Sequence, residues 1–300
     1  MTSPHRTRWT IITLAVVIAA FALAACGSSK PVPTATVTET ATPSSTASGS
    51  ATVSPSPSST APPAQMTISV YFMRGEFVGT AHRSVPQTTA VATAAMTALL
   101  GGPLASEKAA GLATIIPTGT KLRSVKVSNG IATVDLSSAY DSGGGTLSMT
   151  ARLAQVVYTL TQFPTVKGVD FKIDGKKVTV FGGEGIVLGH PQRRADYENL
   201  TPPIFVESPA LGDTLKSPIT FWGTANVFEA QFQVQLFDSK GKVLVEKAVH
   251  ATSGTGTRGT FKTTLSFSTS ATKGRLKTYD LSAKDGKPVG IINIPLTFAH

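Results

Sequence analysis

The sequence predicts two folded domains, an α+β domain over residues 66–186 and an all-β sandwich over residues 203–300. Apolar residues recur at both strand and helix spacing in the first segment, but only at strand spacing in the second. Turn signals rich in Gly, Asn and Asp separate the apolar segments in both. Residues 26–65 lack such a pattern, and residues 187–202 form a connector.

The α+β domain is expected to contain two helices. Residues 68–72 first alternate as a strand. Residues 91–99 then have helical apolar spacing, which the Gly-Gly-Pro run at 101–103 ends. A second helix begins near Thr146 and ends before Pro164, because the residue before a proline disfavours helical geometry.

Two hairpins complete the α+β domain. The first turns at Asn129-Gly130, a pair that favours a type I′ turn, and the last turns at Asp174-Gly175. The element order β-α-β-β-α-β-β therefore predicts helices packed against one sheet.

Four segments of this domain resemble the GerMN domain of sporulation and germination proteins. They are RLAQVVYTLTQFP at 152–164, VDFKIDG at 169–175, IPTGT at 116–120 and VDLS at 134–137. The resemblance covers nearly all of residues 66–186 and implies an α+β interaction module with no established catalytic residues.

About seven strands in about 100 residues are expected in the second domain, which is the size of an immunoglobulin-like sandwich. The strands cover residues 204–207, 217–225, 231–238, 242–250, 260–267, 276–282 and 291–296. Pro295 would place the last strand at an edge or a bulge, because proline cannot donate to a ladder.

Short motifs in this segment resemble the immunoglobulin-like domain of bacterial spore germination proteins. They include Ser208-Pro209, Ser217-Pro218, the GTA run at 223–225 and the RGTF run at 258–261. The usual neighbour of that domain is the GerMN domain, so the two resemblances support each other. They imply binding or scaffolding outside the membrane, and the Ala-rich composition with a Ser/Thr/Pro tether favours an actinobacterial source.

The N-terminus has the pattern of a lipoprotein signal peptide over residues 1–25. Basic residues precede a short apolar run, and the LAAC sequence at 23–26 resembles the lipobox of bacterial lipoproteins. The resemblance implies palmitate-type lipidation of Cys26, the single cysteine, and anchoring at the extracytoplasmic face of the cell membrane. An ordinary secretory signal is the alternative. Residues 26–65 would then be a disordered Ser/Thr/Pro-rich tether.

The net charge of +10 is not concentrated in one basic stripe. Lys176-Lys177 and Arg193-Arg194 are isolated pairs, typical of solvated surfaces. We therefore expect no nucleic-acid partner, although the mild positive charge favours anionic lipids and acidic wall polymers.

Motifs for catalysis, metals or cofactors are weak. His82, His190 and His250 lack zinc-ligand spacing, and the Ser-x-x-Lys match at 270–273 lies in an expected loop without its companion motifs. The triple glycine at 143–145 could present N–H groups to an anion, but a flexible helix entry is the favoured interpretation. The sequence predicts no catalytic, metal-ligating or cofactor-binding residue.

Two further groups of side chains could carry binding. Asp135 and Asp141 could form a carboxylate pair, although a solvated rim is favoured. Trp222, Phe221 and Phe228 could form a platform for sugar stacking, although a core position is favoured for Trp222.

Three functions remain open, with a non-catalytic envelope lipoprotein that scaffolds protein contacts ranked first. It predicts an exposed apolar patch on one domain. A binding protein for glycans or wall polymers is the alternative, and it predicts aromatic and basic side chains on one concave surface. A wall hydrolase ranks last, and it requires a pocket that unites His82, His190 or His250 with Ser and Asp.

Overall fold

A long antiparallel hairpin opens the first domain in the computed structural model, which describes residues 63–183 and 185–300. Its strands are β1 (Gln65–Arg74) and β2 (Phe77–Pro86), and β3 (Leu112–Ala113) pairs with the other side of β1. The sequence pattern predicts β1 but misses β2. Residues 78–81 of β2 are all buried, since β2 packs on strand β10 (Ile204–Ser208) of the second domain, so the strand does not alternate.

A second sheet has the order β4-β5-β6-β7, with β5 and β6 parallel and the other pairs antiparallel. Its strands are β4 (Leu122–Ser128), β5 (Ile131–Leu136), β6 (Gly168–Ile173) and β7 (Lys176–Lys177). The predicted type I′ turn is confirmed, because Asn129 and Gly130 both have positive φ. The sequence pattern also places Val178 and Val180 in the last hairpin. The hairpin is shorter than that, because Val180 pairs in a separate two-stranded ribbon.

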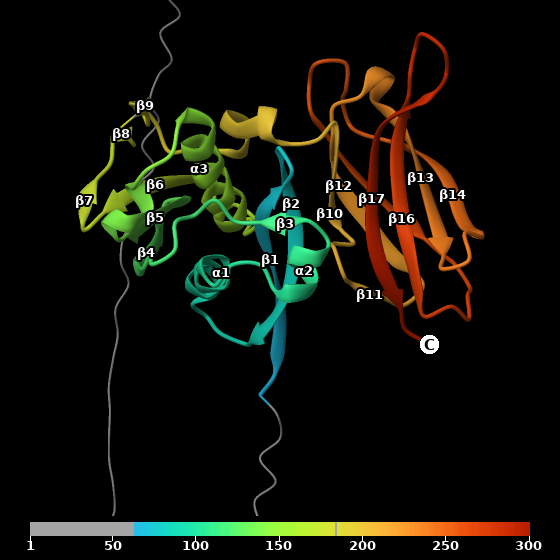
Figure 1. Ribbon diagram of the computed structural model, residues 1–300, viewed down its shortest axis with the longest axis horizontal. Helices are drawn as coiled ribbons and strands as arrows, with labels where there is room; N and C mark the ends of the chain where they lie inside the picture. Colours follow the sequence, from blue (N-terminus) through green and yellow to red (C-terminus); the bar gives the residue numbers. More distant parts are fainter. Residues whose placement is uncertain (1–62, 184) are drawn as a thin grey trace, which may run out of the picture. The chain divides into compact units, whose positions relative to one another are not determined.

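The two helices that the sequence predicts lie between the two sheets and not against one, which corrects the expected packing (Figure 1). Helix α1 (Val91–Leu100) contacts β1 and β4, and α3 (Thr146–Leu160) contacts β1 and β6. Every residue from Arg152 to Leu160 is therefore buried, the polar ones included. The remaining elements are α2 (Ala105–Ala109), η1 (Ser138–Asp141), β8 (Val180–Phe181) and β9 (Ile186–Val187).

The second domain is a sandwich of a three-stranded sheet, β10-β12-β15, and a five-stranded sheet, β11-β17-β16-β13-β14. Its further strands are β11 (Thr214–Leu215), β12 (Ile219–Ala225), β13 (Gln231–Asp238), β14 (Val243–His250), β15 (Gly259–Leu265), β16 (Lys273–Leu281) and β17 (Pro288–Phe298), with a short turn of helix, η3 (Phe228–Ala230), before β13. The rings of Phe221, Phe232 and Phe261 meet between the sheets, with centroids 4.8 to 6.3 Å apart. All seven expected strands are present, and β11 is additional.

Pro295 lies in the part of β17 that pairs with a strand on one side only. Strand β11 pairs in parallel with Thr297 and Phe298 only, so β17 has β16 as its single strand partner at Pro295. The expectation of an edge strand therefore holds at the proline itself, but not at the end of β17.

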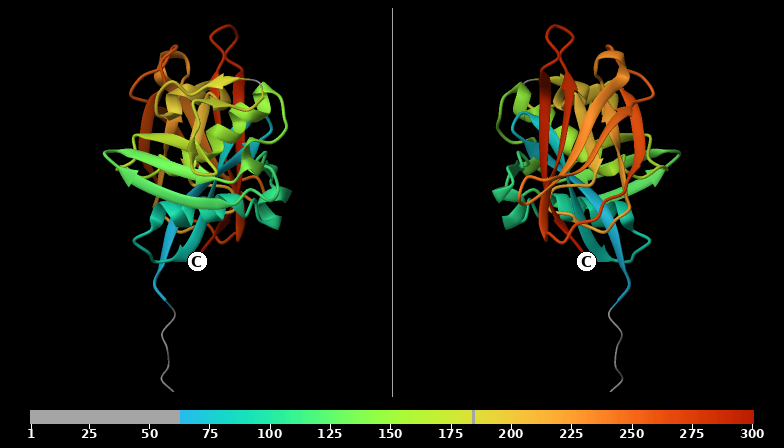
Figure 2. Two further views of the ribbon diagram at one scale, coloured as in Figure 1. Left: turned by 90° about the vertical axis from the view of Figure 1, so that its left-hand side faces the viewer. Right: turned by 90° about the vertical axis from the view of Figure 1, so that its right-hand side faces the viewer.

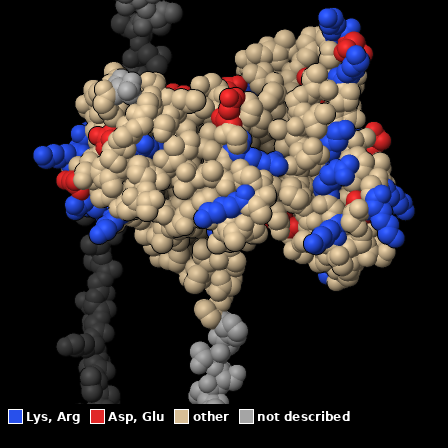
Figure 3. All heavy atoms as spheres, in the orientation of Figure 1, with Lys and Arg blue, Asp and Glu red and all other residues tan. Residues whose placement is uncertain are grey.

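The two domains are joined by a 3-10 segment, η2 (Arg194–Leu200), and the described residues belong to one compact unit. Figure 2 shows the hairpin β1–β2 beside the sandwich in two further views. On the face seen in Figure 3, Lys and Arg are spread over both domains with Asp and Glu between them. Within the described residues, no helix has the length and hydropathy needed to cross a membrane.

Truncation of Phe221 to alanine should lower the free energy of unfolding by about 3 to 5 kcal/mol, because it leaves a cavity in the sandwich core. Phe221 is fully buried, whereas Phe228 is 51% exposed. The Phe228→Ala variant is the control and should change stability by only about 0.5 kcal/mol. Urea unfolding of both variants measures the difference. Equal losses would contradict this account of the core.

Candidate interdomain binding cleft

A buried cluster around Arg194 connects the first domain, the connector and the sandwich. The Arg194 Nη1 atom donates to both carboxylate oxygens of Glu207, each at 2.9 Å. Its Nε donates to the Thr161 hydroxyl at 2.9 Å, and its guanidinium lies 5.1 Å from the ring centroid of Tyr71 and 4.7 Å from that of Tyr158. The Tyr71 hydroxyl donates to Glu207 as well. Each charged group in the cluster therefore has its partners.

Burial and charge both shift the pKa values in this cluster. Burial raises the pKa of Tyr71 above its ordinary value, and it raises the pKa of Tyr158 to about 12. Burial alone would lower the pKa of Arg194, but Tyr71 and Glu207 beside the guanidinium raise it above the usual arginine value. At neutral pH the cluster thus contains a neutral tyrosine pair and a charged arginine.

Further contacts between the two domains surround this cluster. The Nδ1 atom of His82 on β2 lies 2.9 and 3.1 Å from the carboxylate oxygens of Asp213 in the sandwich. Arg74 donates to the carbonyl oxygen of Asn293 on β17 at 2.9 Å. The ring of Phe205 on β10 lies against the rings of Tyr71 and Tyr158. The two domains therefore share a continuous polar and aromatic contact.

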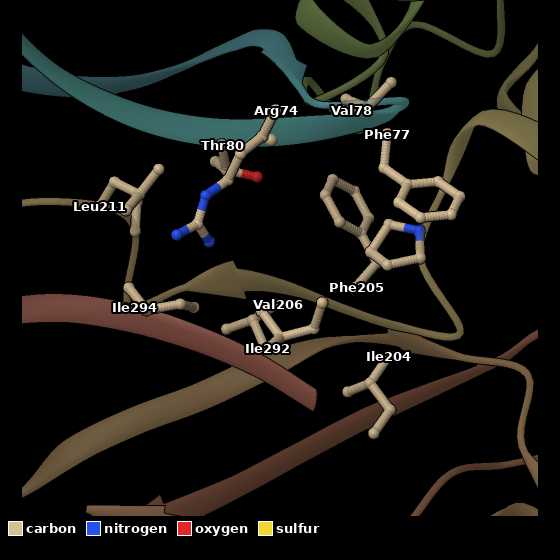
Figure 4. Close-up of a pocket in the computed structure, with 13 residues that line it drawn as sticks. Arg74, Phe77, Val78, Thr80, Ile204, Phe205, Val206, Leu211, Ile292 and Ile294 are labelled. Carbon is tan, nitrogen blue, oxygen red and sulfur yellow. The ribbon is translucent and has the colours of Figure 1, made fainter. Parts of the chain in front are cut away.

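A small apolar cavity lies within this contact (Figure 4). Its volume is about 60 Å³, and its lining comes from the β1–β2 hairpin on one side and from β10 and β17 on the other. Arg74 points into it, and the buried Thr80 hydroxyl, also on its wall, has no hydrogen-bond partner among the described residues. The size suits a few water molecules better than an organic ligand.

A much larger, open cleft lies beside the Arg194 cluster. Its volume is about 1050 Å³, and both domains contribute to its walls. The lining residues are Thr161 and Gln162 after α3, Arg194 and Glu207 from the cluster, and Thr220, Trp222, Gly223, Thr224, His250, Thr252, Thr260, Phe261 and Lys262 from the sandwich. This cleft combines an aromatic ring, hydroxyl groups and basic groups on one concave surface.

Strand alternation explains why these side chains meet. Along β12, Phe221 points into the sandwich core, so Trp222 points to the outer face of the three-stranded sheet. In the register with β15, Trp222 stands opposite Lys262 and Thr224 stands opposite Thr260. The outer face therefore presents a row of polar side chains around one indole ring.

A second surface lies on the first domain, at the free edge of β4. A groove of about 340 Å³ runs between β4 and the start of α1. Its apolar lining residues are Ala90, Val91, Ala92, Val125, Val127, Phe163 and Val166. Val127 is 44% exposed, so part of this lining faces solvent. The groove is an exposed apolar patch next to an unpaired strand edge.

The expected core position of Trp222 is wrong. Trp222 is only partly buried and lines the cleft, because it occupies the outward phase of β12. Phe221 is fully buried in the core, and Phe228 is 51% exposed on η3. These three aromatic residues therefore do not form one platform.

The three candidate histidines are in different places. His82 pairs with Asp213, His190 lies within the connector with its Nε2 atom 3.7 Å from a carboxylate oxygen of Asp196, and His250 lines the cleft. Among the described residues, no hydrogen bond joins one of these histidines to a serine side chain, and no group of three His, Cys, Asp or Glu side chains could hold a metal ion.

The two candidate carboxylates hold separate turns. Asp135 accepts the N–H of Gly175 at 3.0 Å, and Asp141 accepts the N–H of Gly182 at 2.7 Å. Each carboxylate therefore holds a loop that lies about forty residues further along the chain, and the two loops are separate.

A cation holds the loop before α3 at the first glycine of the triple, Gly143, and at two residues that precede it. The Arg152 guanidinium donates to the carbonyl oxygens of Tyr140, Ser142 and Gly143 at 2.6 to 2.9 Å. This anchored arrangement differs from the expected flexible helix entry, because a buried arginine gathers the loop carbonyls. The Ser-x-x-Lys match at 270–273 lies between β15 and β16, with Lys273 as the first residue of β16.

Arg194 and Glu207 were missed from the sequence. Arg194 was interpreted as half of a solvated pair, but only 27% of its side chain is exposed. Its partner Glu207 is only 2% exposed. A single acidic residue inside the apolar strand 204–208 was the one available signal. Cys26, the signal peptide and the tether lie outside the described residues.

Comparisons with known protein families give one match in each domain. Residues 69–179 match the family model Germane, described as sporulation and spore germination. Residues 203–287 match the family model Gmad2, described as the immunoglobulin-like domain of bacterial spore germination. A comparison with curated proteins gives no match.

Three solved structures are similar to parts of the chain. The first GerMN domain of the sporulation protein GerM from Bacillus subtilis is 20% identical, with 44% of this chain and 99% of that chain covered and a TM-score of 0.36. A protein from Clostridium perfringens described as a lipoprotein is 24% identical, with coverages of 46% and 93% and a TM-score of 0.33. The tandem GerMN domains of GerM are 15% identical, with coverages of 62% and 60% and a TM-score of 0.38.

Replacement of Arg194 by alanine should lower the free energy of unfolding by about 3 to 5 kcal/mol, because it leaves the Glu207 carboxylate buried without its counter-charge. The neighbouring Arg193 is exposed, and Arg193→Ala should change stability by about 0.5 kcal/mol or less. Denaturant unfolding of both variants compares the two. A loss of the same size for both would argue against the cluster.

Alkaline pH should destabilise the protein through Tyr158. The pKa of Tyr158 rises from 10.0 to about 12 on folding. The folded state therefore holds this proton more tightly than the unfolded chain does. The resulting stabilisation is complete below pH 10 and is lost as the pH rises towards 12. Denaturant unfolding across this range measures the decrease. The Tyr158→Phe variant keeps the ring but cannot ionise, so its stability should fall less steeply. An identical fall would contradict the assignment.

Proposed function

Because the chain carries a Germane domain followed by a Gmad2 domain, we propose that it is a non-catalytic scaffolding lipoprotein of the cell envelope. In this proposal, Cys26 is lipidated and holds the two domains at the extracytoplasmic face of the membrane. The first domain binds an extended segment of another envelope protein at the free edge of β4. The observation that carries the proposal is the apolar groove beside that edge.

An unpaired edge offers backbone groups to a partner. Strand β4 is the terminal strand of its sheet, so one side of its seven residues has no strand partner among the described residues. A peptide that adds to such an edge gains main-chain hydrogen bonds, and its alternate side chains enter neighbouring pockets. The groove lies where those side chains would be, with Val125 and Val127 on its β4 wall.

Charge on β4 favours a different protein over a second copy of this chain. Arg123 and Lys126 are exposed on the strand. Arg123 is paired with Asp174, whereas Lys126 has no ion pair among the described residues. Two β4 edges paired with each other would bring two Lys126 side chains onto one small ribbon, and like charges on a shared edge destabilise a sheet. A partner segment with apolar residues at alternate positions and an acidic residue near Lys126 avoids that repulsion.

Site-specific photocrosslinking in intact cells tests this proposal. A photoreactive residue at position 127 should capture one protein segment, whereas the same residue at position 289 should not, although Val127 and Val289 are both 44% exposed. Capture should decrease in a Cys26→Ala variant, because the protein is then not held at the membrane.

The captured segment, made as a synthetic peptide, gives the quantitative measurement. Its affinity for the full chain should fall about tenfold or more in a Val127→Lys variant, because a charge then faces the apolar groove. Equal capture at both positions, capture of wall fragments alone, or unchanged peptide affinity would overturn the proposal. Capture of a second copy of this chain would replace scaffolding by self-association.

A further inference from the structure

We propose that the interdomain cleft binds an acidic carbohydrate chain, with one sugar ring stacked on Trp222. This inference goes beyond the scaffolding function, which uses the β4 edge of the first domain. The cleft has room for several sugar units, since its volume is about 1050 Å³ and it is open along one side. Compact small-molecule sites are mostly apolar and bury most of the ligand. This cleft is open and partly polar, so it suits a chain that stays partly in solvent.

Trp222 supplies the flat apolar surface that a sugar ring needs. The side chain lies on the outer face of β12, is partly exposed and borders the cleft. Within the described part of the chain, no aromatic ring pairs with Trp222, in contrast to Phe221, which contacts two other rings in the core. The indole face is therefore available to the C–H groups of a pyranose.

Hydroxyl groups flank the indole on its own strand, β12, and on the neighbouring strand β15. Thr220 and Thr224 lie two residues to either side of Trp222, and Thr260 stands opposite Thr224. The Thr220 side chain makes no hydrogen bond to any other described residue, while Thr260 and Thr252 lie 3.4 Å apart through their hydroxyls. Such groups both donate and accept, as the hydroxyls of a sugar do.

The charge on the cleft wall selects an acidic chain. Lys262 stands directly opposite Trp222 in the β12–β15 register, and no ion pair involves it among the described residues. His250 also lines the cleft. The single acidic lining residue, Glu207, is 2% exposed and paired with Arg194. A carboxylate or phosphate next to the stacked ring would therefore meet a free cation and no free anion.

Matched oligosaccharides test the inference. The probes are chitotetraose, which is neutral, and a tetrasaccharide of alternating N-acetylglucosamine and N-acetylmuramic acid, which has the same backbone and carries carboxylates. The chain has two tryptophans, so a full-length Trp9→Phe variant leaves Trp222 as the single indole fluorophore. The acidic probe should change the fluorescence of Trp222, and calorimetry should give a higher affinity for it than for chitotetraose.

Variants separate stacking from charge. Trp222→Ala should weaken binding of the acidic probe about tenfold or more, and Trp222→Phe should restore part of the affinity. Lys262→Ala should weaken binding of the acidic probe but not of chitotetraose. Lys277→Ala on the five-stranded sheet is the charge control, and it should leave both affinities unchanged.

Three results would overturn the inference. They are the absence of a fluorescence change with either probe, unchanged affinity in Trp222→Ala, and equal affinity for both probes. Thermal unfolding of Trp222→Ala tests for a folding defect. If Trp222→Ala is unstable, the change at the exposed Lys262 gives an independent answer. The Val127→Lys variant should bind the acidic probe normally, which distinguishes the cleft from the β4 edge.

Discussion

The arrangement of the two domains depends on the ion pair between Arg194 and Glu207. Glu207 belongs to the sandwich and is 2% exposed, so its charge is compensated by a guanidinium from the connector. Two tyrosine rings of the first domain, Tyr71 and Tyr158, lie against that guanidinium. A buried ion pair adds little net stability compared with apolar packing, but separating its members is costly. The cluster therefore penalises every arrangement in which β1, the connector and β10 move apart.

This constraint creates the surfaces on which function can depend. Because β10 packs on the β1–β2 hairpin, the outer face of the three-stranded sheet forms one wall of a cleft. Trp222 lies on this wall and is partly buried. The β4 edge lies on the side of the first domain away from the sandwich (Figure 1). The protein thus offers two separate surfaces, an apolar strand edge and a polar cleft. A scaffold that holds a protein and an envelope polymer together needs two such surfaces.

Helix α3 supports both surfaces because it lies at the centre of the first domain. Its buried polar residues each satisfy a neighbouring group: Thr159 accepts the N–H of Tyr71 on β1, Gln155 accepts the N–H of Ile115, and Arg152 gathers three loop carbonyls. A fully buried helix is expected to carry apolar residues, and these hydrogen bonds allow polar residues to stand in their place. Since unsatisfied polar groups are costly inside a protein, they also fix the helix in one position. The helix ends next to Thr161 and Gln162 on the cleft wall.

The sequence alone determined the element types, most of the boundaries and the turns, because these depend on local forces. Alternation of side chains identifies a strand such as β13, and the positive φ of Asn129 and Gly130 follows from the turn type that this pair favours. Alternation also shows that Phe221 and Trp222 face opposite sides of β12. It does not show which part of the protein packs against each side. Only the tertiary structure decided that β2 lies between two domains, that Arg194 is paired and that Trp222 borders a cleft. Each of these depends on contacts between residues far apart in the chain, and no local pattern encodes which distant surface covers a side chain.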